Sequence, residues 1–385
     1  MIRLNITKFV TPEIIFGKNA IEQVGESCLR LGAKNVLIVS DPGVISAGWM
    51  EKVISICKRT GLRYTTFHQI TTNPKDYEVE LGVNVYLENH CDAVIGVGGG
   101  SALDVAKAIA IITSNGGDIC DYEGVDQIRH PLPPMVMIST TAGSGSEVSQ
   151  FSVIVDSKHQ KKMTIVSKSL VPDIAIIDPY TLVTKDPNLT ASTGMDVLTH
   201  AIEALVSIAA TPLTDVQAKN AISLVAQYLR PSVASKTNEE AKNAMAMASL
   251  QAGLAFSNAI LGAVHAMSHA IGGRFPMSHG EVNAIFLPYV MEYNLIASPK
   301  RFMNIAELMG QDVRGMTEVE AGKKAIKQVK ELSKDIGAPQ RLSEMGLTEK
   351  DISSMSQIAL EDACMITNPR DMTLRDIEYL FSQAL

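Results

Sequence analysis

Two short stretches of the sequence combine acidic and imidazole side chains at a spacing that suits metal binding. The segment TGMDVLTHAIEALVS contains Asp196 and His200, and GAVHAMSHAIGGRFPMSHGE contains His265, His269 and His279. Because residues four apart lie on one face of a helix, Asp196 and His200 can face a single cation. His265 can reach the same cation, with His279 on the loop that follows. One carboxylate and three imidazoles therefore predict a divalent-metal site.

The types of ligand narrow the choice of metal. Carboxylate oxygen together with imidazole nitrogen suits Fe²⁺ or Zn²⁺, whereas Mg²⁺ and Ca²⁺ prefer shells made of oxygen alone. The four ligands do not distinguish iron from zinc. His269 follows His265 by one helical turn, so it lies near the same face. Since four ligands already leave a position for substrate, we expect His269 to act as a general acid and base.

A glycine-rich turn predicts a second binding site, for a nucleotide phosphate. In AVIGVGGGSALDVAKAIA an apolar run ends at Gly98, Gly99 and Gly100, and Ser101 follows as a candidate helix N-cap. Glycine allows close approach of the backbone, and a helix N-terminus presents N–H groups and a positive dipole to a phosphate. A tight strand-to-helix turn without a ligand would have the same sequence. The glycine run lies between a buried strand and an amphipathic helix, and this position favours the phosphate site.

Asp41 is the acidic residue best placed to select the nucleotide. It ends the segment NVLIVSDPG, so it follows the first strand of the pattern, whereas the glycines follow the third. A carboxylate there can accept hydrogen bonds from a ribose hydroxyl and would repel a 2′-phosphate, which predicts NAD in preference to NADP. The alternative is that Asp41 only begins an Asp-Pro-Gly turn.

A metal site and a dinucleotide site in one chain predict metal-assisted hydride transfer. A divalent cation lowers the pKa of an alcohol oxygen and polarises an aldehyde carbonyl, which favours hydride exchange with nicotinamide. The hydroxyl-rich segment STTAGSGS at 139–146 could supply further donors to the phosphate or the nicotinamide.

The pattern of elements that must position these residues divides the chain in two. Strand-like runs at 35–40, 63–68, 92–97, 134–139 and 173–178 alternate with segments of helical period. This alternation predicts an α/β domain with a mostly parallel sheet, Rossmann-like, over 1–187. From 188 to 385 the apolar residues recur at three and four, which predicts an all-helical domain. We expect residues 188–190 to form a hinge and helix start. The opening segment, residues 2–16, contains Pro12 and should form an edge strand or pair with another molecule.

Composition excludes several classes of partner. The 385 residues carry a formal charge of -7, and no basic face is visible that would bind a nucleic acid. No uncharged apolar run reaches the roughly 18 residues that span a bilayer, and no apolar signal core follows Met1, so a cytoplasmic location is expected. The five cysteines are scattered without a CxxC pair, which predicts free thiols.

Together these motifs resemble the iron-containing (group III) alcohol dehydrogenases, the family that includes lactaldehyde reductase and 1,3-propanediol dehydrogenase. The resemblance covers nearly the whole chain, through TPEIIFGKNA, VIGVGGGSALDVAKA, PMVMISTTAGSGSEVS, STGMDVLTHAIEALVS, SHGEVNA and TNPRDMTLRDI. It implies a dehydroquinate synthase-like fold, an NAD cofactor and Fe²⁺. It also implies that the amino-terminal strand pairs with a second subunit, in a homodimer or a larger homo-oligomer.

Residue by residue, the resemblance implies metal ligation by Asp196, His200, His265 and His279, in agreement with the spacing. It places Asp41 at the adenine ribose and Gly98, Gly99, Gly100 and Ser101 around the pyrophosphate. It further assigns Thr140, Thr141, Ser144 and Lys162 to the cofactor, with Asn73 and Asp104 as weaker candidates. Ser144 and Phe151 replace the polar groups that relatives often carry near the nicotinamide.

We therefore expect an oxidoreductase that interconverts a primary or short-chain alcohol and its aldehyde. One alternative is an NAD- and metal-dependent polyol dehydrogenase or lyase on the same scaffold. A sugar-phosphate substrate would require basic residues near the metal, and Arg274 is the only one in that stretch. The other alternative is a catalytically silent structural relative that keeps the fold.

Overall fold

A six-stranded sheet forms the first half of the molecule. The computed structural model describes residues 8–275 and 277–385. The strands are β1 (Glu13–Phe16), β2 (Asn35–Val39), β3 (Arg63–Phe67), β4 (Ala93–Gly98), β6 (Met135–Ser139) and β9 (Ile174–Ile177), in the order β1-β9-β6-β4-β2-β3. Every neighbouring pair is parallel. The predicted α/β half with a parallel sheet is confirmed.

Helices cover both faces of this sheet because its central strands are apolar on both sides. Leu37 and Val39 of β2 pack with helices α4 (Asp76–Glu88) and α5 (Gly100–Asn115), whereas Val36 and Ile38 pack with α1 (Val24–Arg30) and α3 (Trp49–Thr60). Continuous apolar runs are typical of strands in buried parallel sheets. The short helix α2 (Pro42–Ser46) follows β2 directly. The order of layers therefore follows from the alternation in the sequence.

A second, smaller sheet has no counterpart in the predicted pattern. It contains β5 (Gly124–Val125), β8 (Lys161–Val166) and β7 (Phe151–Asp156), and β7 and β8 form an antiparallel hairpin. Both strands of the hairpin are largely buried. This hairpin brings Phe151 and Lys162 toward the second half of the chain, so it contributes to the candidate site.

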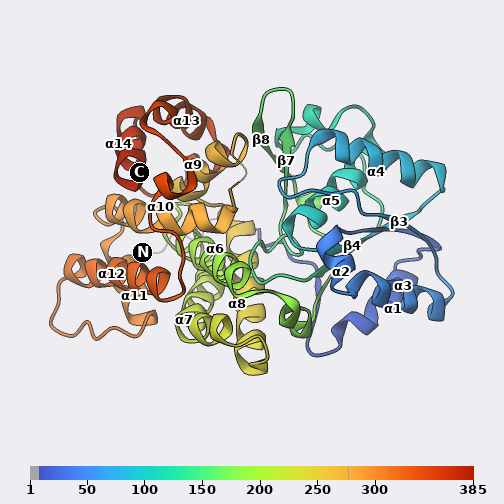
Figure 1. Cartoon of the computed structure of the whole chain (residues 1–385), viewed down its shortest axis with the longest axis horizontal. Helices are drawn as coiled ribbons and strands as arrows, with labels where there is room; N and C mark the ends of the chain where they lie inside the picture. The colour runs from blue at the N-terminus through green and yellow to red at the C-terminus, as the bar shows by residue number, and fades with distance from the viewer. Residues whose placement is uncertain (1–7, 276) are drawn as a thin grey trace.

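Helices make up the rest of the chain, as predicted. From residue 187 onward, the elements in the described part are α6 (Pro187–Val206), α7 (Pro212–Ala234), α8 (Glu239–Ala259), α9 (Ala263–Gly272), α10 (His279–Asn294), α11 (Pro299–Leu308), α12 (Glu318–Asp335), α13 (Glu349–Glu361) and α14 (Leu374–Ala384), with single 3₁₀ turns such as η6 (Ala363–Thr367). In Figure 1 the sheet lies in the right half of the view and most of these helices lie in the left half. The described helices include no single one that is long and apolar enough to cross a membrane, although α8 and α9, bent by 100°, pass that test as a pair.

Predictions at the ends of two elements have different outcomes. The helix start predicted at 188–190 is confirmed within a residue, because α6 begins at Pro187 and the Asp186 side chain caps it by accepting a hydrogen bond from Leu189 N, whereas a hinge there stays a prediction. At the other end of the sheet, β1 is an edge strand, as predicted, but it begins only at Glu13 and pairs with β9 of the same chain. The first part of the predicted strand, residues 2–7, lies outside the described residues.

Candidate metal centre and cofactor cleft

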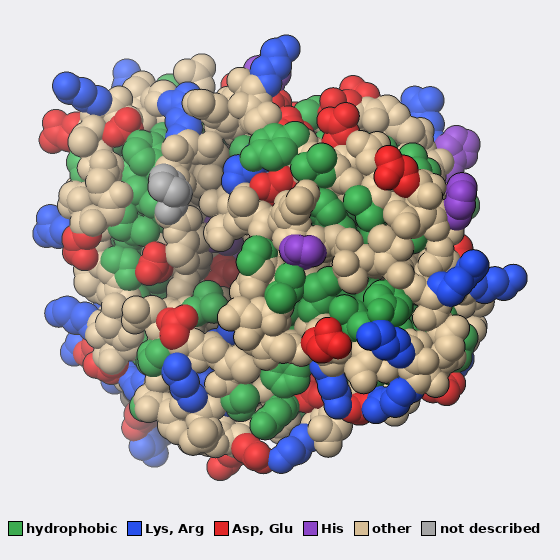
Figure 2. Space-filling view, turned by 45° about the vertical axis from the view of Figure 1, so that its right-hand side comes forward, with side chains coloured by type: hydrophobic (Ala, Val, Ile, Leu, Met, Phe, Trp, Pro, Cys, Tyr) green, Lys and Arg blue, Asp and Glu red, His purple; other side chains and the backbone are tan. Residues whose placement is uncertain are grey.

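The two halves of the chain enclose one large cavity. Its volume is about 920 Å³, and residues from β2 to α5, the β7–β8 hairpin, α6, α9 and α10 line it. Figure 2 shows that the surface is hollowed near the centre of the view. The predicted metal and nucleotide residues both occur in the lining. These residues run from Asp41 to His279 in the sequence, and the fold brings them to one cleft.

The four predicted metal ligands, here called the ligand cluster, come together at the helical wall of this cavity. Asp196 and His200 lie one turn apart on the buried helix α6. The Oδ1 atom of Asp196 is 3.9 Å from Nε2 of His200 and 3.8 Å from Nε2 of His265. Asp196, His265 and His279 each place one possible ligand atom within 4.8 Å of the others. The ligand cluster is defined as Asp196, His200, His265 and His279.

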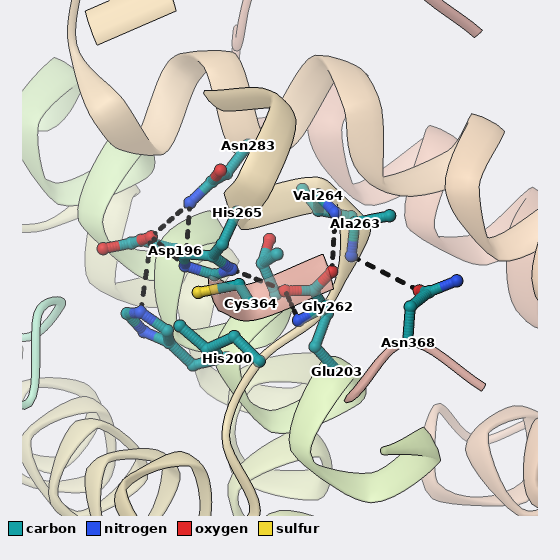
Figure 3. A network of polar contacts seen from close by, with 12 residues as sticks. Asp196, His200, Glu203, Gly262, Ala263, Val264, His265, Asn283, Cys364 and Asn368 are labelled. Carbon is teal, nitrogen blue, oxygen red and sulfur yellow. Dashed lines mark hydrogen bonds and ion pairs between the residues drawn. The ribbon is translucent and has the colours of Figure 1, made fainter. Parts of the chain in front are cut away.

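The acceptor atoms of the ligand cluster converge on one small volume. The side-chain Nδ2 group of Asn283 lies 2.7 Å from Asp196 Oδ1, 3.2 Å from His265 Nε2 and 3.3 Å from His279 Nε2. Figure 3 shows the amide pointing from α10 toward Asp196 and His265. A carboxylate oxygen and imidazole nitrogens that meet in this way fit a cation of the Fe²⁺ or Zn²⁺ type.

Close contacts between helix backbones allow this convergence. An ideal Cβ atom on Gly280 would lie 2.2 Å from the carbonyl oxygen of Ser192, so only glycine lets the start of α10 approach α6. At the start of α9, a Cβ on Gly262 would lie 2.9 Å from Oε1 of Glu203. Gly280 directly follows the ligand His279, and Gly262 N donates to Glu203, the carboxylate that contacts His265. The glycines of HGE and LGA therefore serve the geometry of the site.

Glu203, which the sequence analysis did not identify, fixes the orientation of His265. Its carboxylate accepts hydrogen bonds from the backbone N–H groups of Gly262 (3.1 Å) and Val264 (2.7 Å), and it lies 2.6 Å from Nδ1 of His265. Figure 3 shows this network to the right of His265. A carboxylate on one ring nitrogen keeps the proton there and directs the other nitrogen toward a metal. Glu203 lies three residues after His200 on α6, which is the only sequence signal for it.

Burial and mutual charge control protonation in the ligand cluster. Burial opposes the charged form of Asp196, yet His200 and His265 hold the pKa of this carboxyl below its usual range. Burial lowers the pKa of His200 to about 4 and that of His279 well below its usual value. Burial also opposes charge on His265, but Asp196 and Glu203 raise its pKa to about 9. Since a ligating nitrogen must be deprotonated, a cation bound here would replace the proton on Nε2 of His265, which faces Asp196, and the proton on Nδ1 would stay with Glu203.

His269 lies beside the ligand cluster and is held by Asp362 from the far end of the sequence. Its Nδ1 atom is 2.9 Å from Oδ2 of Asp362, whose Oδ1 accepts a hydrogen bond from Cys364 N. Burial opposes ionisation of Asp362, but His269 lowers the pKa of this carboxyl to about 2. His269 lines the cavity, and with Nδ1 occupied its other nitrogen, Nε2, is the one available to the cavity. Asp362 was not identified from the sequence, because nothing in DACMITNPR marks it.

The glycine turn lies on the opposite wall of the cavity. Strand β4 ends at Gly98, Gly99 caps helix α5, and α5 begins at Gly100. Ser101 is therefore in the first turn and not at the N-cap, which corrects the prediction. The side chain of Thr141 lies 3.2 Å from the position of a Cβ on Gly99, and Ser144 lies 2.9 Å from one on Gly100. The absence of side chains leaves the N–H groups of this helix start open to the cavity.

Asp41 begins a turn, as one reading of the sequence allowed, and it also lies at the cavity. Its Oδ1 accepts hydrogen bonds from Gly43 N (2.8 Å) and Val44 N (3.0 Å), so it caps helix α2. It also lines the cavity, and its Oδ2 lies 3.1 Å from the position of a Cβ on Gly98. The carboxylate is thus fixed by its own helix and remains next to the glycine turn.

Most predicted cofactor residues line the same cavity, but two do not. The residues in the lining are Asp41, Asn73, Gly99, Gly100, Ser101, Asp104, Thr141, Ser144 and Lys162. Gly98 and Thr140 are absent from it because both lie within the sheet edge, where Thr140 N donates to Gly98 O at 2.9 Å. Both residues lie behind the turn, and their assignment to the cofactor stays a prediction.

Two buried charges face the cavity from the α/β half. Burial raises the pKa of Asp104 to about 6, although Lys107 opposes the shift, and burial lowers the pKa of Lys162 to about 8. Oδ2 of Asp104 accepts a hydrogen bond from Val153 N, whereas Oδ1 has no partner among the described residues. A buried polar atom without a partner, beside a cavity, is typical of a group that a ligand satisfies.

The chain matches two family models that together cover most of its length. Residues 11–179 match the model described as "Iron-containing alcohol dehydrogenase", and residues 190–385 match the model described as "Fe-containing alcohol dehydrogenase family, C-terminal".

Individual relatives agree with these matches. The chain is 43% identical to 1,3-propanediol dehydrogenase of Klebsiella pneumoniae over 379 residues, which is 98% of each chain. It is 41% identical to NAD-dependent methanol dehydrogenase of Bacillus methanolicus over 377 residues, 98% of this chain and 99% of the relative. A crystal structure of 1,3-propanediol oxidoreductase superposes with a TM-score of 0.97 at 42% identity, covering 99% of this chain and all of the other.

Proposed function

Because the chain belongs to the iron-containing alcohol dehydrogenase family, we propose that its ligand cluster holds a ferrous ion and that its glycine turn holds NAD. The chain is an oxidoreductase that interconverts an alcohol and its aldehyde with NAD. One observation carries the assignment to a specific site. The ligand cluster and the start of α5 face each other across a single cavity of about 920 Å³.

The residues of the chain supply positioning, exclusion of water and proton transfer. A ferrous ion in the ligand cluster would supply Lewis-acid chemistry, because it lowers the pKa of an alcohol oxygen and polarises a carbonyl. The N–H groups at the start of α5 bind the pyrophosphate and so direct the nicotinamide into the cavity. The buried rings of Phe256 and Phe151 keep water away from the reacting carbon.

His269 acts as the general base for alcohol oxidation and as the general acid for aldehyde reduction. Its Nδ1 atom is hydrogen-bonded to Asp362 at 2.9 Å, so Nε2 exchanges the proton of the substrate hydroxyl. Asp362 stabilises the imidazolium that forms. Bound NAD would supply the hydride acceptor for the alcohol carbon, and NADH the hydride donor for the aldehyde, so the protein itself has to move only the proton.

Asp41 selects NAD over NADP. Its carboxylate is fixed by Gly43 N and Val44 N and lies beside the glycine turn, where a ribose hydroxyl can donate to it and a 2′-phosphate would be repelled. Comparing kcat/KM with NADH and NADPH tests this role. The Asp41→Ser variant should gain activity with NADPH relative to NADH, whereas equal use of the two by the unmodified chain would contradict it.

The assay that tests the proposed function is NADH oxidation with a panel of short aldehydes. Activity should require added Fe²⁺, disappear after chelation and return when the metal is restored. The His200→Ala variant should lose metal and activity together, whereas His68→Ala, at an exposed position, should keep both. Bound metal without turnover of any aldehyde or polyol would instead support the structural alternative.

Assembly, domain boundary and location also belong to this proposal. We place the α/β domain at 1–187 and the helical domain at 188–385, and we expect a homodimer or a larger homo-oligomer in the cytoplasm. The exposed edge of β1 supports the assembly, since an edge strand presents unpaired backbone groups to another chain. Light scattering of the purified protein measures the assembly directly.

A further inference from the structure

Two phenylalanine rings, Phe256 and Phe151, line the cavity next to the ligand cluster and form what is here called the aromatic wall. The ring of Phe256 stacks on His200, with centroids 4.4 Å apart and an interplanar angle of 23°. The ring of Phe151 contacts Phe256 in a tilted arrangement at 5.8 Å. Both side chains are buried and both line the cavity. A substrate whose oxygen lies at the ligand cluster therefore has its carbon chain alongside these rings.

Hydrogen bonds from neighbouring residues hold the two rings in place. The buried amine of Lys107 donates to the carbonyl oxygens of Phe151 (2.9 Å) and Ser149 (2.7 Å). Next to the rings, Gln150 N donates to Oγ of Ser257 at 3.1 Å, and the Gln150 amide donates to the carbonyl oxygen of Ser257. The start of β7 is thus fastened to α8 at the residues adjacent to both phenylalanines. The backbone that carries the two rings cannot shift without breaking these bonds.

The nearest hydroxyl group before Phe151 in the sequence, that of Ser149, already has a hydrogen-bond partner. Oγ of Ser149, two residues before Phe151, lies 3.3 Å from Nζ of Lys107 and accepts a hydrogen bond from it. Gly145 packs against the Phe256 ring: its φ is +61°, and a Cβ there would lie 3.0 Å from the ring. The part of the cavity surface that Phe151 and Phe256 form is therefore aromatic carbon, packed from behind.

We propose that Phe151, packed on Phe256, makes the chain selective for alcohols that carry no second hydroxyl group. A hydroxyl on the second or third carbon of the substrate would lose its hydrogen bonds to water against these rings and gain none in return. The substrate class is then the unsubstituted short primary alcohols and their aldehydes. This inference rests on the proposed function and adds the substrate to it.

The size of the effect follows from how apolar pockets discriminate. An apolar pocket rejects a substrate that differs by one added hydroxyl by roughly a hundredfold at most. We expect kcat/KM for 1-propanol to exceed that for 1,3-propanediol by about tenfold to a hundredfold. This expectation is notable because a relative at 43% identity is named as a 1,3-propanediol dehydrogenase.

Two variants at one position test the role of the ring. Phe151→Asn introduces an amide that can bond the second hydroxyl, and it should lower the 1-propanol to 1,3-propanediol ratio at least tenfold. Phe151→Leu removes the ring but stays apolar, so it should change the ratio by no more than about threefold. Metal content and unfolding temperature, measured on both variants, identify one that has not folded. An unmodified chain that prefers the diol, or an Asn variant with an unchanged ratio, would overturn the proposal.

A binding measurement on the unmodified chain does not depend on turnover. Propionamide and 3-hydroxypropionamide are unreactive analogues of the two aldehydes, and calorimetry gives their Kd values on the NADH complex loaded with metal. The unsubstituted amide should bind at least tenfold more tightly. Equal Kd values for the two amides would contradict the proposal that the phenylalanine rings select against a second hydroxyl group. Absence of turnover with both alcohols, despite the expected preference between the amides, contradicts the proposed function and leaves the inference supported.

Discussion

At the scale of single residues, some side chains of the candidate metal centre can be predicted from the sequence and others cannot. Asp196 and His200 share a helix face, so their spacing alone predicts that they meet. Glu203 and Asp362 orient His265 and His269, but only the fold brings them there. A ligand set can thus be predicted from spacing. Its hydrogen-bond partners cannot, because they come from distant segments with no shared period.

Glu203 provides a test of orientation by a residue that does not itself bind metal. In Glu203→Gln the carboxylate becomes a neutral amide that still accepts one hydrogen bond, so the proton on Nδ1 of His265 is less strongly held. We expect the affinity for Co²⁺, followed by its visible spectrum, to fall by about tenfold to a hundredfold. Glu292→Gln, an exposed change on α10, serves as the control and should leave affinity unaltered. Equal affinities for both variants would show that Glu203 has no role in orientation.

Asp104 predicts a dependence of stability on pH. Burial raises its pKa from 3.8 to about 6, so the folded state holds this proton more tightly than the unfolded state. Its stabilising contribution is therefore complete below pH 3.8 and is lost as the pH rises through 6. At 1.36 kcal/mol per pKa unit the loss is about 3 kcal/mol.

The Asp104→Asn variant cannot ionise, so it should lack this loss. Urea unfolding of chelated protein should show the free energy of unfolding of the variant, relative to the unmodified chain, rising by about 3 kcal/mol between pH 4 and pH 7. Asp121→Asn, at an exposed position, should show no such trend. A difference for Asp104→Asn that stays constant with pH would be inconsistent with the assignment.

At the scale of elements, the sequence predicts the sheet and the long helices well and the connections poorly. The runs at 35–40 and 92–97 become β2 and β4 within a residue or two, because a buried parallel strand is continuously apolar. The β7–β8 hairpin was not predicted. Its strands lie between two recognised elements and contain lysines and a Ser, so their burial depends on tertiary contacts that no local pattern reports.

The close contact at Gly280 predicts that the packing of α10 on α6 affects metal affinity. A Cβ at this position would lie 2.2 Å from the carbonyl oxygen of Ser192, which is backbone and cannot rotate away. In Gly280→Ala, α10 should shift from α6 and carry His279 with it. We expect the free energy of unfolding to fall by about 1–3 kcal/mol and Co²⁺ affinity to fall at least tenfold.

The matched control makes the same change at a crowded glycine far from the centre. A Cβ on Gly322 would lie 2.3 Å from a methyl group of Leu295. Gly322→Ala should lower stability and leave the affinity for Co²⁺ intact. If both glycine variants lose affinity in proportion to stability, packing at Gly280 has no specific effect on the ligand cluster.

At the scale of the whole molecule, the candidate active site lies between the two halves of the chain, and both contribute residues to it. The ligand cluster comes from α6, α9 and α10, whereas the glycine turn and Asp41 come from the sheet edge (Figure 1). The order of strands and helices predicts two such bodies. The cavity between them depends on how two surfaces fit, which local sequence patterns do not encode.

This division predicts separate stabilisation by the two ligands. Each should stabilise the folded chain by about 2.7 kcal/mol at one hundred times its Kd, and calorimetric unfolding should show the two effects adding. Mg²⁺, which prefers oxygen ligands, serves as the control metal and should raise the unfolding temperature little. If NADH fails to stabilise the protein unless metal is present, the two sites are coupled. The prediction that the stabilisation by metal and the stabilisation by NADH add would then be wrong.

The link between Asp362 and His269 bears on how the enzyme is made. Asn368, six residues farther on, accepts a hydrogen bond from Ala263 N at the start of α9. During synthesis, every member of the ligand cluster leaves the ribosome well before these two late residues. The nascent chain therefore has all its metal-binding side chains, and the contacts of α9 to Glu203, while the contacts of α9 to Asp362 and Asn368 are still missing. We therefore expect the metal centre to reach its final geometry only after translation is complete.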